Sequence, residues 1–85
     1  MDTSGIREAV LATIRRIAPE VDAAALKADK PLRKQIDLDS MDWLNVIVGL
    51  HEALHIDIPE ADYGKLTTLD AIVDYLAGRG AAGNG

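Results

Sequence analysis

One serine stands where a chemical group could be anchored. Ser40 follows Asp39 and precedes Met41, where a polar loop turns into a strongly apolar helix. A serine at a helix N-terminus is exposed and lies beside backbone N–H groups that have no partner within the helix. These N–H groups and the helix dipole favour an anion at that end. The segment therefore predicts a hydroxyl to which a phosphate could be linked.

The same serine is poorly placed to act as a nucleophile by itself. Its neighbours are Asp39 and Met41 rather than the glycines of a nucleophile elbow. His51 lies further along the same helix, roughly 16 Å away at 1.5 Å rise per residue, which is beyond the hydrogen-bond reach of a general base. We therefore expect no catalytic residue, and a protein that is not an enzyme.

Two short patterns resemble metal sites. His51-Glu52-Ala53-Leu54-His55 matches the H-E-x-x-H pattern of zinc proteases, but no third ligand follows at a recognised spacing. An EF-hand reading beginning at Asp37 fails, because its sixth position is Asp42 instead of Gly and its twelfth is Val48 instead of Glu. We expect no metal site, and two surface histidines beside a core leucine.

Length and composition indicate one small domain. The 85 residues include no cysteine, so neither a disulfide framework nor a protein thiol is available. We expect a folded helical domain over residues 1–79 and a disordered tail over residues 80–85. The polar start and the lack of a long apolar run predict neither a signal peptide nor a membrane span, hence a cytoplasmic protein.

The negative charge is concentrated in one part of the chain. The net charge is −5, but residues 35–64 contain no Lys or Arg and hold seven acids. These acids are Asp37, Asp39, Asp42, Glu52, Asp57, Glu60 and Asp62. Such a field attracts basic partners and repels nucleic acid, although a merely solvated face would have the same composition.

The spacing of apolar residues predicts helices joined by loops. A first helix begins at a cap on Thr3 or Ser4 and ends before Pro19. The connection over residues 18–38 is long, with possible helical turns at 22–26 and 32–35. Four of its apolar side chains are expected to reach the core, namely Val21, Leu26, Leu32 and Ile36.

The second half of the chain predicts three further helices. The second helix runs from about Ser40 to His55, with Asp39 or Ser40 as its cap. A short helix follows over about residues 61–66. The last helix begins at a cap on Thr67 or Thr68 and ends at the glycines 78 and 80.

The second helix carries two apolar stripes at about 100° per residue. One is its core face, formed by Trp43, Val46, Ile47, Leu50 and Leu54. The other lies about a third of a turn away and consists of Met41, Leu44 and Val48, extended by His51 and His55. A helix in so small a domain has one core to face, so the second stripe is either covered by the long loop or exposed for docking.

Taken together, these segments resemble an acyl carrier protein. The resemblance rests on Asp39-Ser40-Met41-Asp42, on Ile58-Pro59-Glu60, on Leu66-Thr67-Thr68-Leu69 and on Ile72-Val73-Asp74-Tyr75-Leu76, in that order and spacing. It covers roughly residues 36–77. It implies an all-α four-helix bundle with a long first loop and a short third helix.

The resemblance also implies a function. Ser40 would carry 4′-phosphopantetheine, added from coenzyme A by a phosphopantetheinyl transferase that Asp39 helps to engage. The arm would hold acyl groups as thioesters for fatty-acid, polyketide or related biosynthesis. Met41, Leu44, Val48 and Glu52 would contact partner enzymes that have basic docking patches. The carrier would act as a monomer.

Several residues depart from the family pattern. Asp37 stands where Gly is usual and Met41 where Leu is usual, and Asn45 and His51 replace acids common on the second helix. These departures favour a specialised stand-alone carrier over a general fatty-acid carrier. Trp43 is interpreted as a core aromatic, with the sharper hypothesis that its indole lines the mouth of an acyl cavity.

Two alternatives remain open from the sequence. A peptidyl or aminoacyl carrier would use the same arm. A small acidic helical adaptor that only binds proteins would explain the charge and the second stripe, but not the serine motif together with the downstream spacing.

Overall fold

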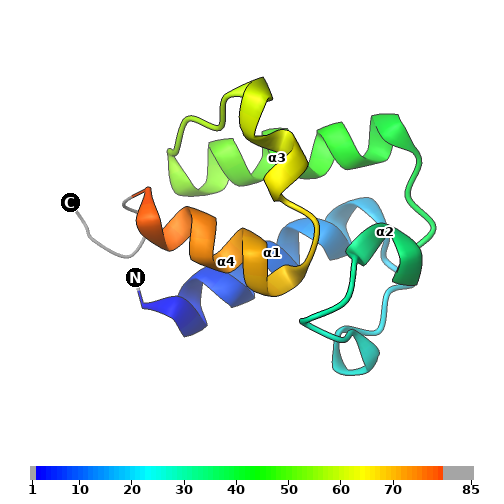
Figure 1. Ribbon diagram of the computed structural model, residues 1–85. Helices are drawn as coiled ribbons and strands as arrows, with labels where there is room; N and C mark the ends of the chain where they lie inside the picture. The colour runs from blue at the N-terminus through cyan, green and yellow to red at the C-terminus, as the bar shows by residue number, and fades with distance from the viewer. Residues whose placement is uncertain (1, 80–85) are drawn as a thin grey trace.

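The computed structural model describes residues 2–79, and the predicted tail over residues 80–85 lies outside this range. Three longer helices and three short ones follow one another without a strand in the described residues (Figure 1). The elements in order are α1 (Thr3–Ile17), η1 (Ala23–Ala25), α2 (Leu32–Gln35), α3 (Ser40–Leu54), η2 (Glu60–Lys65) and α4 (Leu69–Gly78). The predicted all-α bundle, with a long first loop and a short third helix, is confirmed.

The core forms where the three longer helices meet. Helix α1 packs against both α3 and α4. Each helix buries residues spaced three or four apart, as one face of an amphipathic helix requires. Those residues are Ile6, Val10 and Ile14 of α1, Val46, Ile47 and Leu50 of α3, and Leu69, Ile72 and Leu76 of α4. The core face predicted for the second helix is confirmed, with Leu54 half-buried at its end.

The long connection is packed against this core. Leu32 and Ile36 are buried, and Val21 and Leu26 are half-buried against the same cluster. The predicted helical turns are present as η1 and α2. The N–H of Leu32 donates to the carbonyl of Thr67 at 2.8 Å, which ties the connection to the segment before α4. All four apolar residues expected in the core are therefore in contact with it.

Each longer helix begins at a side-chain cap. Asp39 caps α3 and Thr68 caps α4, as predicted. The predicted cap of α1 on Thr3 or Ser4 is wrong, because both residues lie inside the first turn. Asp2 is the cap, and its Oδ1 accepts a hydrogen bond from the N–H of Gly5 at 2.9 Å. A carboxylate there also suits the positive end of the helix dipole.

No helix in the described range is long and apolar enough to cross a membrane.

Helices α1 and α3 approach closely at Gly49. A Cβ built on Gly49 would lie 2.8 Å from Cγ2 of Thr13, which is closer than carbon atoms pack. Thr13 is buried and cannot easily turn away, because its hydroxyl donates to the carbonyl of Ala9 at 2.8 Å. Gly49 is therefore required for the spacing of the two helices.

We predict that Gly49→Ala lowers the stability of the fold. Replacing Gly by Ala in a helix interior normally gains about 1 kcal/mol, but overpacking a core costs about 1–3 kcal/mol. The free energy of unfolding in urea should therefore fall by up to about 2 kcal/mol.

The chain offers two controls for this prediction. A Cβ on Gly78 meets nothing within 4 Å, so Gly78→Ala should not destabilise the protein. Thr13→Ser removes the clashing methyl group and keeps the hydroxyl, so it should restore tolerance of Gly49→Ala in the double variant. Equal stabilisation by Gly49→Ala and Gly78→Ala would contradict the proposed close approach.

Candidate functional site

The chain enters α3 through a short segment in which buried and exposed residues alternate. Ile36 and Leu38 are 4% and 6% exposed, whereas Asp37 and Asp39 are exposed. The N–H of Leu38 donates to the carbonyl of Ile36 at 2.9 Å, which tightens the segment. The two buried side chains anchor it to the core, so the residue that follows Asp39 is held at the surface. That residue is Ser40, the first residue of α3.

The start of α3 combines a side-chain cap with free N–H groups. Oδ1 of Asp39 accepts a hydrogen bond from the N–H of Asp42 at 2.8 Å, and its carbonyl accepts one from the N–H of Trp43 at 2.9 Å. Within residues 2–79, the N–H groups of Ser40 and Met41 have no acceptor. A helix of 15 residues also places the positive end of its dipole there. The arrangement can hold an anion linked to the Ser40 hydroxyl.

Capping geometry alone does not single out this serine. Helix α1 begins in the same way, with Asp2 as the cap and Thr3 and Ser4 exposed in the first turn. The difference lies in the surface next to the hydroxyl. The start of α1 shows no large exposed apolar side chain in the described residues, whereas Ser40 is followed by Met41, which is 71% exposed.

An apolar stripe runs along α3 from the site. We define the apolar stripe as Met41, Leu44 and Val48, which are 71%, 46% and 48% exposed. They are the large exposed hydrophobic residues of the part of the chain that the structure describes. The second stripe of the sequence prediction is therefore exposed rather than covered by the long loop. Glu52, one turn beyond Val48, is exposed as well.

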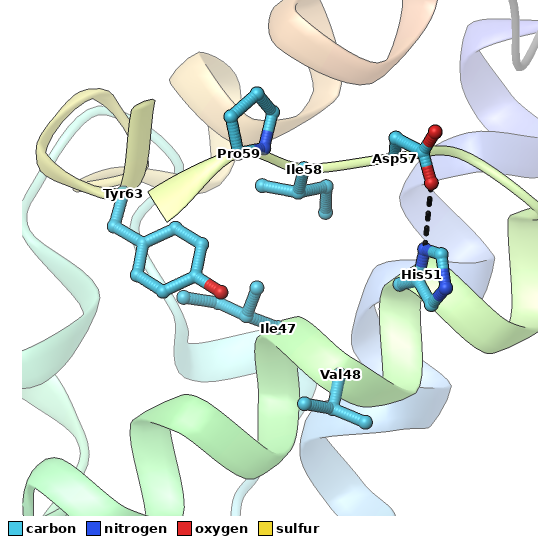
Figure 2. A pocket seen from close by; sticks show the side chains of 7 residues that line it. All are labelled: Ile47, Val48, His51, Asp57, Ile58, Pro59 and Tyr63. Atoms are coloured by element: carbon cyan, nitrogen blue, oxygen red, sulfur yellow. Dashed lines mark ion pairs between the residues drawn. The ribbon is translucent and has the colours of Figure 1, made fainter. Parts of the chain in front are cut away.

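A hollow of about 360 Å³ lies at the far end of the apolar stripe (Figure 2). Its lining comes from α3, from the segment that leads into η2 and from η2 itself. The lining residues are Ile47, Val48, His51, Asp57, Ile58, Pro59 and Tyr63. Val48 belongs to both the stripe and the hollow, so the exposed apolar surface continues into a concave region. Such a shape can take an apolar group.

Trp43 does not line this hollow. Its side chain is 9% exposed and belongs to the buried core, which agrees with its interpretation as a core aromatic. The indole borders a separate hollow of about 210 Å³, together with Arg33 and Tyr63. Because Trp43 follows Ser40 by three residues, the two lie on neighbouring turns of one helix face.

The histidine pattern forms a helix end in the structure. Nδ1 of His51 lies 2.7 Å from the carbonyl oxygen of Ile56 and 3.8 Å from Oδ1 of Asp57. His55 adopts a left-handed conformation, with φ of 56°, and terminates α3. Both histidines are exposed, as predicted. Among residues 2–79, no three acidic or imidazole side chains gather closely enough to hold a metal ion.

A polar contact fixes the short helix η2 to α4. The hydroxyl of Tyr75 donates to Oδ2 of Asp62 at 2.6 Å, and Lys65 pairs with Oδ1 of the same carboxylate at 3.3 Å. The hydrogen bond from Tyr75, then the contact with Lys65, lowers the pKa of Asp62. The same bond raises the pKa of Tyr75, because it is made by the protonated hydroxyl. The contact holds the wall of the 360 Å³ hollow that contains Tyr63.

Part of this site was not predicted from the sequence. In the sequence, Ile58 and Pro59 form a motif of the family resemblance and Tyr63 falls in a predicted short helix, but no pattern assigns any of them to a hollow. They line the hollow because the chain folds back over α3 after His55. Only the Ile-Pro pair, which forces an extended path, hinted at this return.

Comparison with known proteins places the chain in a family. Residues 8–76 match the family described as phosphopantetheine attachment site. The acyl carrier protein of Rubrobacter xylanophilus is 32% identical over 73 residues, which cover 82% of this chain and 90% of that protein. An acyl carrier protein of Campylobacter jejuni is 32% identical over 56 residues, which cover 66% and 73%. The chain therefore belongs to the acyl carrier protein family of phosphopantetheine-attachment domains.

The family and the structure agree on the cofactor. The predicted cofactor, 4′-phosphopantetheine, is confirmed by the family match. The group is linked to proteins through a phosphodiester. The start of α3 offers an exposed hydroxyl beside two N–H groups that have no acceptor among residues 2–79, which suits such a link. When bound, the group supplies a thiol that the cysteine-free chain lacks.

We predict that Tyr75→Phe lowers the melting temperature in a pH-dependent way. The lowered pKa of Asp62 gives stability that is fully present above its unfolded pKa of about 4 and is lost as the pH falls from there through the lower pKa of the folded state. The raised pKa of Tyr75 gives stability that is present below about pH 10 and is lost as the pH rises further. The difference in melting temperature between the variant and the parent should therefore be largest between these limits.

Tyr63→Phe is the matched control, since the hydroxyl of Tyr63 makes no hydrogen bond within the described residues. A difference for Tyr75→Phe that stays constant from pH 3 to pH 7 would count against a role of the Asp62 carboxylate.

Proposed function

We propose that Ser40 carries the phosphopantetheine arm and that the protein presents acyl thioesters on it to partner enzymes. The observation that carries the proposal is the exposed Ser40 hydroxyl at the first position of α3, beside the N–H groups of Ser40 and Met41. These N–H groups would hold the phosphate of the arm and would stabilise its charge by about 0.3–1 kcal/mol. The domain itself then holds and presents the arm, while the chemistry takes place at the distant thiol.

Asp39 has two roles in this proposal. Its side chain caps α3 and so fixes the position of Ser40. Its carboxylate is also exposed and adjacent in sequence, which suits contact with a phosphopantetheinyl transferase and the metal ion of that enzyme. The second role depends on negative charge, whereas capping needs only a side-chain oxygen.

The apolar stripe and Glu52 form the proposed docking surface for partner enzymes. Met41, Leu44 and Val48 are exposed on the side of α3 that starts at Ser40, and the 360 Å³ hollow extends this surface. The seven acids of residues 35–64 belong to the same part of the chain, and their charge would match partners with basic patches. Charge would set the rate and orientation of encounter, and apolar contact would supply affinity.

Fatty-acid, polyketide or related specialised biosynthesis fits an acyl carrier, and a monomer in the cytoplasm fits a carrier that must visit several enzymes. A peptidyl or aminoacyl carrier would use the same serine and arm. The adaptor alternative has no observation in its favour beyond the charge and the stripe, which the carrier proposal also explains.

The attachment is tested by intact mass. After incubation with coenzyme A and a broad-specificity phosphopantetheinyl transferase, we expect a gain of one phosphopantetheinyl group that Ser40→Ala abolishes. The chain contains one other serine, Ser4, which lies in the first turn of α1. Ser4→Ala should leave the gain unchanged, and a gain that persists in Ser40→Ala would falsify the assignment.

We predict that Asp39→Asn separates the two roles of Asp39. Asn caps helices about as well as Asp, so the melting temperature should stay close to that of the parent. Loss of the carboxylate should slow arm transfer by about tenfold or more, as expected when a charged contact worth roughly 1.5–3 kcal/mol is lost. Rates are followed by the same mass measurement at limiting transferase.

Asp2→Asn is the matched control, because Asp2 caps α1 with the same geometry. An unchanged transfer rate in Asp39→Asn would leave Asp39 with a capping role alone.

A further inference from the structure

A basic surface lies on the long connection, opposite in sign to the acidic part of the chain. Residues 27–34, which we call the basic loop, carry four of the nine basic residues and one acid. The basic residues are Lys27, Lys30, Arg33 and Lys34, and the acid is Asp29, all of them exposed. Within residues 2–79, none of the four cations forms an ion pair. Their charge is therefore available to another molecule.

The backbone of the basic loop is held by one side chain. Oε1 of Gln35 accepts a hydrogen bond from the N–H of Lys27 at 2.7 Å. Nε2 of Gln35 donates to the carbonyl of Lys27 at 2.9 Å and to that of Lys30 at 3.0 Å. An amide that spans the loop in this way fixes its shape, and a preorganised surface loses less entropy on binding.

The basic loop is also tied to the rest of the fold on its other side. The N–H of Leu32 donates to Thr67 at 2.8 Å, and the N–H of Asp70 donates to the carbonyl of Ala28 at 3.0 Å. Leu32 is fully buried. Helix α2 and the start of α3 lie at the same end of the molecule (Figure 1), so the basic loop stands near the Ser40 end of α3.

An apolar hollow adjoins this basic surface. The lining of the hollow of about 210 Å³ includes Arg33 of the basic loop and Trp43 of α3. It also includes Tyr63 of η2 and Leu66, the residue directly after η2. Its walls thus combine two aromatic rings with one guanidinium group. Arg beside aromatic side chains is typical of the well-packed centres of protein interfaces.

We propose that the basic loop and this hollow form a second docking surface, for a partner protein that presents carboxylates around one apolar side chain. The carboxylates would pair with the free cations of the basic loop, and the apolar side chain would enter the hollow beside Trp43. The acids of residues 35–64 would select basic partners, whereas the basic loop would select acidic partners. Repulsion between like charges would disfavour the wrong class of partner protein at each surface. The proposal does not depend on attachment at Ser40.

Two other occupants are less well matched. Nucleic acid would meet the net charge of −5 of the whole chain. A second copy of the chain has suitable acids in residues 35–64. Such a contact would pair the basic loop of one copy with the acids of the other, and it would leave one basic loop and one acidic region free to bind further copies. Both are outcomes that the experiment can distinguish.

The test is an NMR titration of the full ¹⁵N-labelled chain. The probe is the blocked peptide Glu-Asp-Leu-Asp-Glu, and the control peptide is Gln-Asn-Leu-Asn-Gln. We expect saturating shifts at amides of the basic loop and at the indole N–H of Trp43, weakening as salt is raised. The double variant Arg33→Glu with Lys34→Glu should weaken binding by about tenfold or more.

Two further variants keep the result interpretable. Arg7→Glu changes the charge in the same sense near the start of α1, which lies at the opposite end of the molecule from α2 (Figure 1), and should leave binding within about twofold. The double variant Lys27→Glu with Lys30→Glu changes two residues outside the helices. It should also weaken binding, so the role of the basic loop can be tested even if Arg33→Glu with Lys34→Glu perturbs α2.

Several results would overturn the proposal. If the neutral peptide bound as tightly as the acidic one, or if shifts were spread over the whole surface, the basic loop would not be the binding site. The same shifts with inorganic phosphate, including the shift at Trp43, would indicate a simple anion site. Self-association at low salt that Arg33→Glu with Lys34→Glu abolishes would show that the occupant is a second copy.

Discussion

The geometry of the site depends on how the chain enters α3. Leu38 is pulled into the core two residues before Ser40, and Asp39 between them closes the first turn of the helix through its carboxylate. Because these two contacts act on adjacent residues, they fix both the depth and the direction of the helix start. A serine in a free loop would present its hydroxyl in many orientations, whereas Ser40 presents it beside backbone donors in one. The departure from the usual family residue at Asp37 falls on an exposed position of this segment and leaves the buried anchors in place.

Helix α3 must serve the core and the surface at once, and its composition reflects both demands. One face buries Val46, Ile47 and Leu50, and Gly49 allows α1 to approach without a side chain between the helices. The adjoining face leaves the apolar stripe exposed, at a cost in solubility that a protein without partners would have no reason to bear. The acids of residues 35–64 offset that cost, since like charges keep copies of the chain apart.

Much of this could be predicted from local patterns. Apolar spacing indicated α1, α3 and α4, and Pro19 and the capping residues Asp39 and Thr68 marked helix boundaries within a residue or two. The cap of α1 was misplaced because Asp2, Thr3 and Ser4 are all good caps, and only the backbone path decides among them. The two hollows could not be predicted. Each is formed where η2 returns over α3, and the sequence near Ile58 shows a break but not where the chain goes next.

A carrier must leave each partner as readily as it binds the next, and the distribution of charge suits that demand. Exposed charges are screened within about 8–10 Å at physiological salt, so they speed and orient an encounter without making a long-lived complex. The part of the chain that supplies α3 is acidic, while Gln35 and the buried Leu32 fix the shape of the basic loop, whose four cations form no ion pair with these acids within residues 2–79. Had the four cations folded onto α3, the opposite charges would have paired within the molecule and neither surface would discriminate. Keeping them apart costs the stability of those ion pairs, which at the surface is at most about 1 kcal/mol each. That loss is small against the selectivity between partners that two surfaces of opposite sign can provide.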